Sequence, residues 1–186
     1  MTTDTASNRR LRLPLMLTLM IALGACGMKA PERAEAMNFA RAETSSHQQI
    51  DPARRDRAVA IAKELRARGQ RVWCVPFARN ASGIDLRGNA KTWWSQAAGV
   101  YQRSHTPKVG AVMAFSATSK MPLGHVAVVS KVVSDREILI DHANWRRNQI
   151  SLGMKVIDVS KANDWSQVKV TNTGARTYPV AGFISK

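Results

Sequence analysis

Three side chains in the last two thirds of this chain are suited to nucleophilic chemistry. Cys74 lies in the run Trp73-Cys74-Val75-Pro76-Phe77-Ala78-Arg79, and His125 and His142 follow downstream. The only other cysteine of the 186 residues is Cys26. A single available thiol with histidines elsewhere in the sequence is the pattern of a cysteine nucleophile and its general base. The alternative interpretation is an inert, buried cysteine that packs as a small apolar side chain.

The N-terminus carries the features of an export signal. A basic segment from Asn8 to Arg12 is followed by an apolar stretch from Leu13 to Leu23 and by small residues before Cys26. Residues 1–25 are therefore a predicted signal peptide, and their apolar stretch is shorter than the ~20 residues that cross a bilayer. The tetrad Leu23-Gly24-Ala25-Cys26 resembles a bacterial lipobox, which implies lipid attachment at Cys26. We expect an exported, periplasmic or otherwise extracytoplasmic lipoprotein anchored to a membrane; an ordinary signal peptide is the alternative.

The charge and the composition set further limits. The formal net charge is +15, which attracts anionic partners over long range. Because neither zinc-finger spacing nor an aromatic-rich basic motif is present, a nucleic-acid partner is not predicted. Outside the cytoplasm, the natural candidates are cell-wall carboxylates and anionic lipid or polysaccharide surfaces. Residues 26–50 are polar and read as a flexible tether. Residues 51–186 have the composition and length of one compact domain, which we expect to be a monomer.

Helix signals precede strand signals within this domain. Asp51 and Pro52 predict the start of a first helix and Gly69 its end. A second helix is expected to begin at Cys74, with Pro76 in its first turn, and a third to cover about Ala90 to Ala98. Six short strands are predicted at Val109–Phe115, His125–Val133, Glu137–Ala143, Leu152–Val159, Val168–Thr171 and Tyr178–Ile184. This order predicts an α+β domain in which N-terminal helices pack on an antiparallel sheet of about five to six strands.

The predicted elements give the thiol and the first histidine defined positions. At the first residue of a helix, the sulfur of Cys74 lies near unpaired backbone N–H groups, which favour the thiolate. The same N–H groups are suited to stabilising an oxyanion. His125 begins a strand that is apolar on both faces, directly after Gly124, where a glycine permits another backbone to approach closely.

Strand parity limits which group can orient His125. The strands from His125 and from Glu137 are joined by a short polar turn, so we expect a hairpin. With a two-residue loop, His142 and Asn144 lie on the face of His125, whereas Asp141 points to the opposite face. The choice between His142 and Asn144 depends on the register and stays open.

At this point the sequence resembles a known family. The segments Cys74–Arg79, Pro107–Gly110, Gly124–Val129, Ile140–Trp145 and Tyr178–Phe183 occur in the order found in CHAP domains, which are cysteine, histidine-dependent amidohydrolases/peptidases. The resemblance extends from about Trp73 to Ser185. It implies a papain-like fold, cleavage of peptidoglycan amide bonds, Cys74 as nucleophile and His125 as general base. Two positions differ from the usual pattern: Ala111 replaces an acidic residue, and His142 stands where the family usually has a glutamate.

The implied reaction is acyl transfer through a thioester and requires no metal or other cofactor. Zinc binding by Cys74, His105, His125 and His142 is the weaker alternative, because their spacing lacks the short paired intervals of structural zinc sites. Arg79, Trp93 and Trp94 are candidates for a substrate groove, with core packing as the alternative for the tryptophans. Besides an exported hydrolase that acts on a muramoyl–peptide or stem-peptide amide, two functions remain: a non-catalytic wall-binding module and a basic adhesion or nucleic-acid-binding surface protein.

Overall fold

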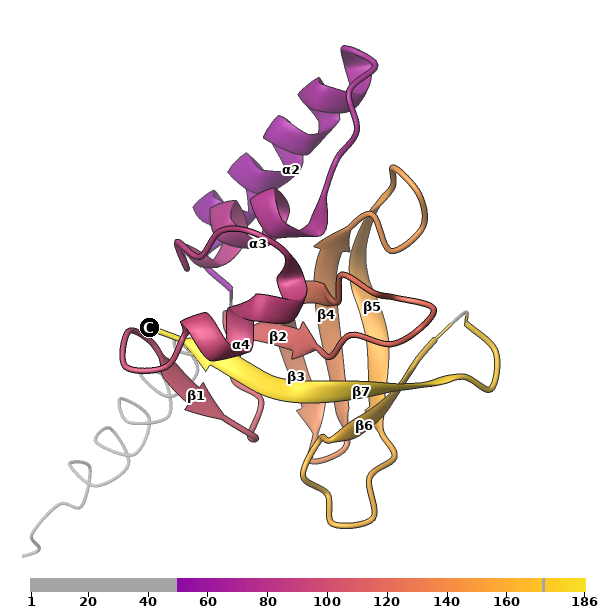
Figure 1. The fold of residues 1–186 in the computed structure, drawn as a ribbon. Helices are drawn as coiled ribbons and strands as arrows, with labels where there is room; N and C mark the ends of the chain where they lie inside the picture. The colour runs from indigo at the N-terminus through magenta and orange to yellow at the C-terminus, as the bar shows by residue number, and fades with distance from the viewer. Residues whose placement is uncertain (1–49, 172) are drawn as a thin grey trace, which may run out of the picture.

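The fold consists of N-terminal helices packed against one side of a curved antiparallel sheet (Figure 1). It was obtained as a computed structural model, which describes residues 50–171 and 173–186. The predicted signal peptide, Cys26 and the tether up to residue 49 lie outside the described residues. Within the described residues, no helix is both long enough and apolar enough to cross a membrane.

The first described helix, α2 (Pro52–Ala67), begins and ends as its sequence predicts. The carboxylate of Asp51 accepts hydrogen bonds from the backbone N–H groups of Ala53 and Arg54, at 3.0 and 3.2 Å, and so satisfies two donors of the first turn. The side chains of Ala58 and Ala62 are buried on the inner face of the helix. Gly69 follows with a φ of +71°, a conformation that glycine adopts at helix ends without steric cost.

Helix α3 (Cys74–Ser82) starts at the predicted residue, and Gly83 ends it in the left-handed conformation. The third predicted helix is divided: a 3₁₀ turn, η1 (Ala90–Thr92), leads directly into the short α4 (Trp93–Gln96). The buried side chains of Phe77, Trp93 and Ala97 attach these segments to the sheet.

The sheet contains seven strands, one more than the five to six predicted. The additional strand, β1, is short and polar, so it lacks the alternation of apolar residues that marks a strand in the sequence. Within the described residues it pairs with the last strand alone. The others are close to their predicted ranges. The seven are β1 (Gln102–Ser104), β2 (Val112–Phe115), β3 (His125–Ser134), β4 (Glu137–Ala143), β5 (Ile150–Asp158), β6 (Gln167–Val170) and β7 (Thr177–Ser185).

The strand order β7-β2-β3-β4-β5-β6 closes on itself, because β6 also pairs with β7. The six strands therefore form a barrel-like antiparallel sheet, and β1 continues the edge of β7 beyond β6. Closure leaves fewer unpaired strand edges than an open sheet of the same size would. The mixed helix-and-sheet architecture confirms the predicted α+β class.

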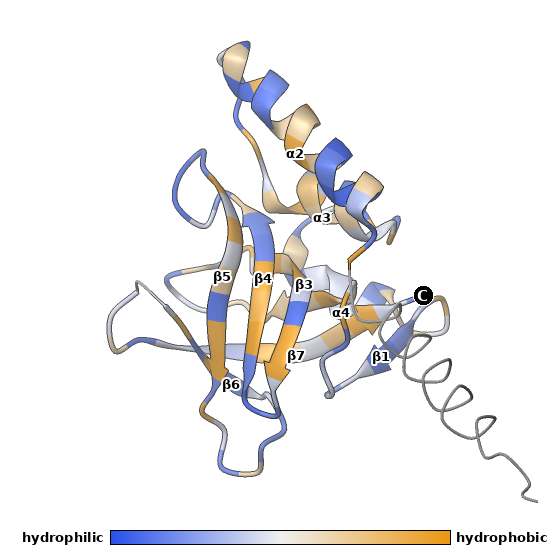
Figure 2. Cartoon of the chain, turned by 180° about the vertical axis from the view of Figure 1, so that it is seen from behind, coloured by the Kyte–Doolittle hydropathy of each residue, from blue (hydrophilic) through white to orange (hydrophobic). Residues whose placement is uncertain are grey.

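The apolar core lies on both faces of the central strands. On β2, Val112 and Ala114 pack toward the helices with Phe77 and Trp93, whereas Met113 and Phe115 point to the interior of the barrel. All four residues of β2 are buried, as expected of a strand that is covered on both faces. Figure 2 shows the corresponding apolar stretches along β3 and β4 and the more hydrophilic helix α2 beside them.

A buried ion pair joins α2 to the sheet. The carboxylate of Asp141 on β4 is 0% exposed and accepts a hydrogen bond from Nε of Arg55 at 2.5 Å. Its second oxygen accepts the backbone N–H of Gly153 at 2.7 Å. Asp141 therefore points away from the barrel interior, as strand parity predicts, and serves the contact between α2 and β4.

The β3–β4 hairpin has two register shifts, between Val129 and Lys131 and between Val132 and Ser134. Each β-bulge changes the parity of the pairing by one, so two of them together restore it. Beyond both shifts, Val128 pairs with Asp141, and the face that carries His125 also carries His142. The predicted face assignment is confirmed.

Candidate active site

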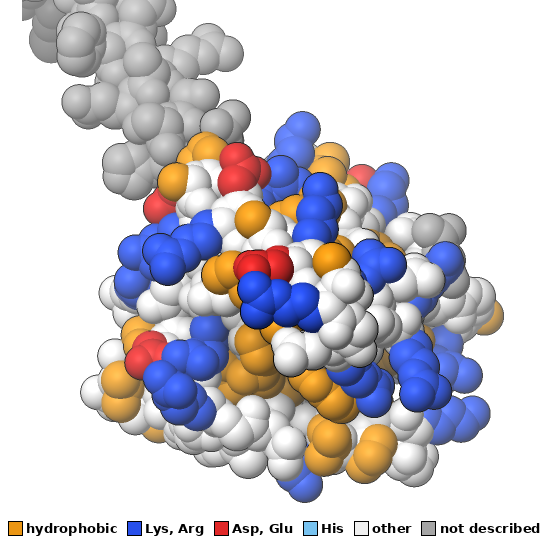
Figure 3. All heavy atoms as spheres, turned by 90° about the horizontal axis from the view of Figure 1, so that it is seen from above, with side chains coloured by type: hydrophobic (Ala, Val, Ile, Leu, Met, Phe, Trp, Pro, Cys, Tyr) orange, Lys and Arg blue, Asp and Glu red, His pale blue; other side chains and the backbone are white. Residues whose placement is uncertain are grey.

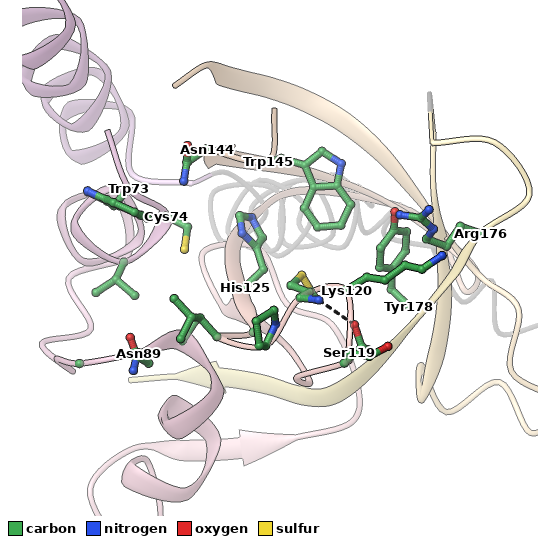
Figure 4. A pocket seen from close by; sticks show the side chains of 18 of the residues that line it. Trp73, Cys74, Asn89, Ser119, Lys120, His125, Asn144, Trp145, Arg176 and Tyr178 are labelled. Carbon is green, nitrogen blue, oxygen red and sulfur yellow. Dashed lines mark hydrogen bonds between the residues drawn. The ribbon is translucent and has the colours of Figure 1, made fainter. Parts of the chain in front are cut away.

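A cavity of about 880 Å³ opens where the start of α3 meets the start of β3. Cys74 and His125 both line it, together with segments before β3 and at the start of β7. Figure 4 shows the sulfur of Cys74 and the ring of His125 pointing into the same space. The lining residues are Trp73, Cys74, Val75, Pro76, Gly88, Asn89, Ala90, Thr118, Ser119, Lys120, Met121, Pro122, Leu123, Gly124, His125, Asn144, Trp145, Arg176, Thr177 and Tyr178.

The first turn of α3 determines the surroundings of the thiol. No side chain caps this turn. Pro76 has no N–H, and the N–H of Phe77 already donates to the carbonyl of Trp73. Within this turn, the backbone N–H groups left near the sulfur are therefore those of Cys74 and Val75.

The pKa of Cys74 is raised above its ordinary value, because the thiol is largely buried. Backbone N–H groups of Val126, Val75 and Cys74 itself favour the thiolate and act in the opposite direction, but burial has the larger effect. The N–H groups at the helix start therefore favour the thiolate, as the sequence predicts, but burial outweighs them. The resting group is therefore a neutral thiol.

His125 and His142 form a hydrogen-bonded pair. Nε2 of His125 lies 2.9 Å from Nδ1 of His142. The two residues are 5% and 0% exposed, respectively. Burial lowers the pKa of His125 well below its ordinary value, with a further contribution from the charge that His142 can carry. Burial alone lowers the pKa of His142 to about 4. Both imidazoles are therefore neutral near pH 7, so His125 is able to accept a proton.

The hydrogen bond between the two rings limits their tautomers. When Nε2 of His125 donates to His142, Nδ1 of His125 is left as a hydrogen-bond acceptor, and His142 carries its own proton on Nε2. The Nε2 atom of His142 is buried and has no hydrogen-bond partner within the described residues.

Aromatic rings enclose the histidine pair. The ring of Trp145 lies 5.0 Å from that of His125 and 5.5 Å from that of His142, measured between centroids. Phe115 packs against His125 at 5.7 Å, and Tyr178 packs against Trp145 at 4.9 Å. These rings exclude water from the pair, which accounts for the low pKa values of both imidazoles.

Asn144, the second candidate for orienting His125, has a different environment. Its φ is +62°, and it stabilises the loop after β4. The side-chain oxygen accepts the N–H of Asn148 at 2.9 Å, and its backbone N–H donates to the carbonyl of Gln149 at 2.7 Å. Asn144 lines the cavity, but the residue in hydrogen-bond contact with His125 is His142.

The three predicted groove residues do not line this cavity, and that expectation requires correction. Trp93 is 0% exposed and belongs to the core beneath α4. Trp94 packs on Gly182, where its ring would meet an added Cβ at 2.6 Å, and against the ring of His105. Arg79 binds the carboxylate of Asp85 through Nε at 3.0 Å. Core packing holds Trp93, and contacts elsewhere in the chain hold Trp94 and Arg79, so none of the three lines the cavity with Cys74.

Several lining residues were not among the predicted site residues. Trp73, 45% exposed, precedes Cys74 directly, and Trp145 directly follows Asn144, so adjacency to the candidates was an available signal. Lys120 lies five residues before His125, whereas Arg176 and Tyr178 lie far from all the candidates in sequence. Closure of the barrel through β7 brings the last two to the cavity, and no local pattern indicates this.

Comparisons with known proteins identify the family to which this part of the chain is related. The CHAP domain model matches residues 66–144, a range that includes Cys74, His125, His142 and Asn144. The match identifies a CHAP domain in the chain and confirms the resemblance seen in the sequence.

Two relatives extend the comparison. The protein named Probable autolysin SsaALP, from Staphylococcus aureus (strain NCTC 8325 / PS 47), is 31% identical over 108 residues, which are 56% of this chain and 40% of that protein. The crystal structure of N-acetylmuramoyl-L-alanine amidase from Staphylococcus aureus is 30% identical and covers 59% of this chain and 30% of its own, with a TM-score of 0.43. The chain thus spans less than half the length of either relative.

Proposed function

We propose that this chain is an exported cysteine amidohydrolase/peptidase that cleaves peptidoglycan amide bonds. The observation that carries the proposal is the placement of Cys74 at a helix start in one cavity with His125, whose Nε2 is hydrogen-bonded to His142 at 2.9 Å. A helix-start thiol beside a strand-start histidine is also the basis for assigning the fold to the papain-like group. The names of the autolysin and the amidase support peptidoglycan as the substrate.

The reaction begins with both groups neutral. Nδ1 of His125 takes the proton from Cys74, and the sulfur attacks the carbonyl carbon of the amide. The N–H groups of Cys74 and Val75 lie at the first turn of α3 and are suited to hold the oxyanion. His125 then donates its proton to the leaving amine as the C–N bond breaks, which leaves a thioester on Cys74.

Water completes the cycle. His125 removes a proton from the water molecule that attacks the thioester, the C–S bond breaks, and the proton returns to the sulfur. His142 is the positioning residue in this scheme. It accepts a hydrogen bond from the Nε2–H of His125 and so keeps Nδ1 of His125 unprotonated and turned to the thiol. Asn144 contributes by supporting the loop that carries Trp145.

Cleavage of purified peptidoglycan sacculi by the wild type, Cys74→Ala and Cys74→Ser tests the proposal. We expect the wild type to release new amino groups and both variants to release at least about 1000-fold fewer, because a missing nucleophile removes most of the rate enhancement. Mass spectrometry of the fragments distinguishes a muramoyl–peptide bond from a stem-peptide bond. Lys161→Gln, which changes an exposed lysine in the loop between β5 and β6, is the control and should match the wild type.

Two results would favour other functions. A wild type that binds sacculi but releases no amino groups would be a non-catalytic wall-binding module on the same fold. Equal release by the wild type and Cys74→Ala would overturn the thiol mechanism.

The lipid anchor is a separate part of the proposal and rests on the lipobox-like tetrad that ends at Cys26. Cells that express the chain are fed labelled palmitate. Label should enter the wild-type protein and be lost in Cys26→Ala; label retained in that variant would exclude attachment at Cys26.

A further inference from the structure

The charged residues of the cavity are all of one sign. Lys120 and Arg176 line it, and no aspartate or glutamate is among its lining residues. A ligand that fills this cavity therefore meets two permanent positive charges with no carboxylate beside them to neutralise them.

Lys120 and Arg176 differ from several arginines of the chain, which form salt bridges with carboxylates. Arg55, Arg79 and Arg136 each bind a carboxylate of the chain, on Asp141, Asp85 and Asp158. Within residues 50–171 and 173–186, neither Lys120 nor Arg176 forms a salt bridge. Both side chains are exposed, so the folded chain itself makes no use of their charge.

The backbone holds both cations in defined places. Lys120 lies in a tight turn in which the N–H of Thr118 donates to the carbonyl of Met121 at 3.1 Å and the reverse bond is 3.0 Å. Arg176 directly precedes β7, two residues before the buried Tyr178. Figure 4 shows Lys120 and Arg176 at the Tyr178 end of the cavity, whereas Trp73 and Asn89 lie at the other end and His125 lies between.

This arrangement fits a carboxylate. The planar guanidinium of Arg176 is able to donate two parallel hydrogen bonds to the two oxygens of a carboxylate, and Lys120 adds a second, compact charge. The half-buried rings of Trp145 and the buried ring of Tyr178 bound this end of the cavity and reduce the solvent screening of the interaction.

We propose that Lys120 and Arg176 form a subsite for an acidic residue of the peptide part of the substrate, a proposal that rests on peptidoglycan hydrolysis as the function of this site. The subsite places the peptide at the Tyr178 end of the cavity and discriminates peptides with a free carboxylate from those in which it is a carboxamide.

The test uses two muropeptides that differ only in the acidic groups of the stem peptide, which are free carboxylates in one and carboxamides in the other. For the wild type, kcat/KM should be about tenfold higher for the free acid, as expected for one charge-assisted contact. In the double variant Lys120→Gln/Arg176→Gln this ratio should fall to about one. Lys161→Gln should keep the wild-type ratio, and thermal unfolding confirms that each variant is folded.

Binding to the Cys74→Ala variant, measured by calorimetry, tests the subsite without catalysis. A dissociation constant about tenfold lower for the free acid, lost when Lys120→Gln/Arg176→Gln is added and largely retained with Arg176→Lys, supports the subsite. Equal binding of the two muropeptides to Cys74→Ala overturns the subsite, even if the wild type cleaves both. Preferential binding of the free acid with no cleavage by the wild type keeps the subsite and overturns the hydrolase.

Discussion

Cys74 and His125 have opposite pKa shifts, and burial is the main cause of both. Burial disfavours the charged form of each group, so it raises the pKa of the thiol and lowers that of the imidazole. The pair consequently rests as thiol and neutral imidazole. The helix start still matters, because its free N–H groups oppose the effect of burial on Cys74 and are available to an oxyanion.

The pH dependence of kcat/KM follows from these directions. His125 has to be neutral to take the thiol proton, and its lowered pKa means that protonation occurs only at pH values below the ordinary histidine value of 6.5. Activity should therefore be level near neutral pH and fall only as the pH decreases below 6.5. The measurement is kcat/KM on a small peptidoglycan fragment from acidic to alkaline pH.

His142→Gln tests the contribution of the hydrogen-bonded partner of His125. It removes the imidazole beside His125 and keeps a side chain that is able to accept a hydrogen bond, so kcat should fall by about ten- to a hundredfold while KM changes little. An acidic limb centred at or above pH 6.5 in the wild type would contradict the neutral buried pair.

At the scale of elements, Gly124 sets the approach of the helical segment to β3, the strand that begins at His125. Its φ is +69°, and a Cβ at this position would lie 2.7 Å from the backbone nitrogen of Lys91 and 2.9 Å from its Cα. The N–H of Lys91 in turn donates to the carbonyl of Leu123 at 2.8 Å. The start of β3, and with it His125, is thus packed directly against the backbone of η1.

Gly124→Ala should destabilise the fold by about 2–4 kcal/mol, because the clash is with backbone atoms that cannot rotate away and adds to the cost of positive φ. Gly153→Ala is the control. Its φ is similar, at +63°, but no atom lies within 4 Å of an added Cβ, so we expect a loss of about 1 kcal/mol. Urea unfolding of the two variants gives both values. Equal losses would mean that η1 moves aside freely.

At the scale of the whole molecule, the surface carries a large excess of positive charge. Figure 3 shows one face on which Lys and Arg side chains are much more numerous than Asp and Glu side chains, in keeping with the net charge of +15. A surface of this kind concentrates the protein on an anionic polymer without fixing one orientation. The subsite at Lys120 and Arg176 acts later, when the peptide enters the cavity.

Binding to intact sacculi should therefore weaken with salt. Between about 50 mM and about 500 mM sodium chloride, the dissociation constant of Cys74→Ala on sacculi should rise at least about tenfold, because screening shortens the range of the surface charge. Cleavage of a small uncharged fragment by the wild type is the control and should change less than about twofold. Salt-independent binding to sacculi would show that contacts other than charge hold the protein to the wall.

Most helices and strands of this protein can be predicted from its sequence, because their signals come from residues close together in the chain. Asp51 and Pro52 predict the start of α2, and the residues around Pro76 predict the start of α3 at Cys74. Six of the seven strands are predicted from the alternation of apolar residues. The shared face of His125 and His142 follows from the period of two along a strand, and the two bulges preserve it because they occur as a pair.

Tertiary structure decided what depends on distance and burial. The choice of His142 over Asn144 as the partner of His125 required the register, and the direction of the pKa shift at Cys74 required the depth of burial. Closure of the barrel brought Arg176 and Tyr178 to the cavity, and packing of the helices on the sheet buried Trp93 in the core. Local sequence patterns indicate secondary-structure propensity and the spacing of apolar residues. Contacts between distant segments form only when the chain folds, and only then do they exclude solvent.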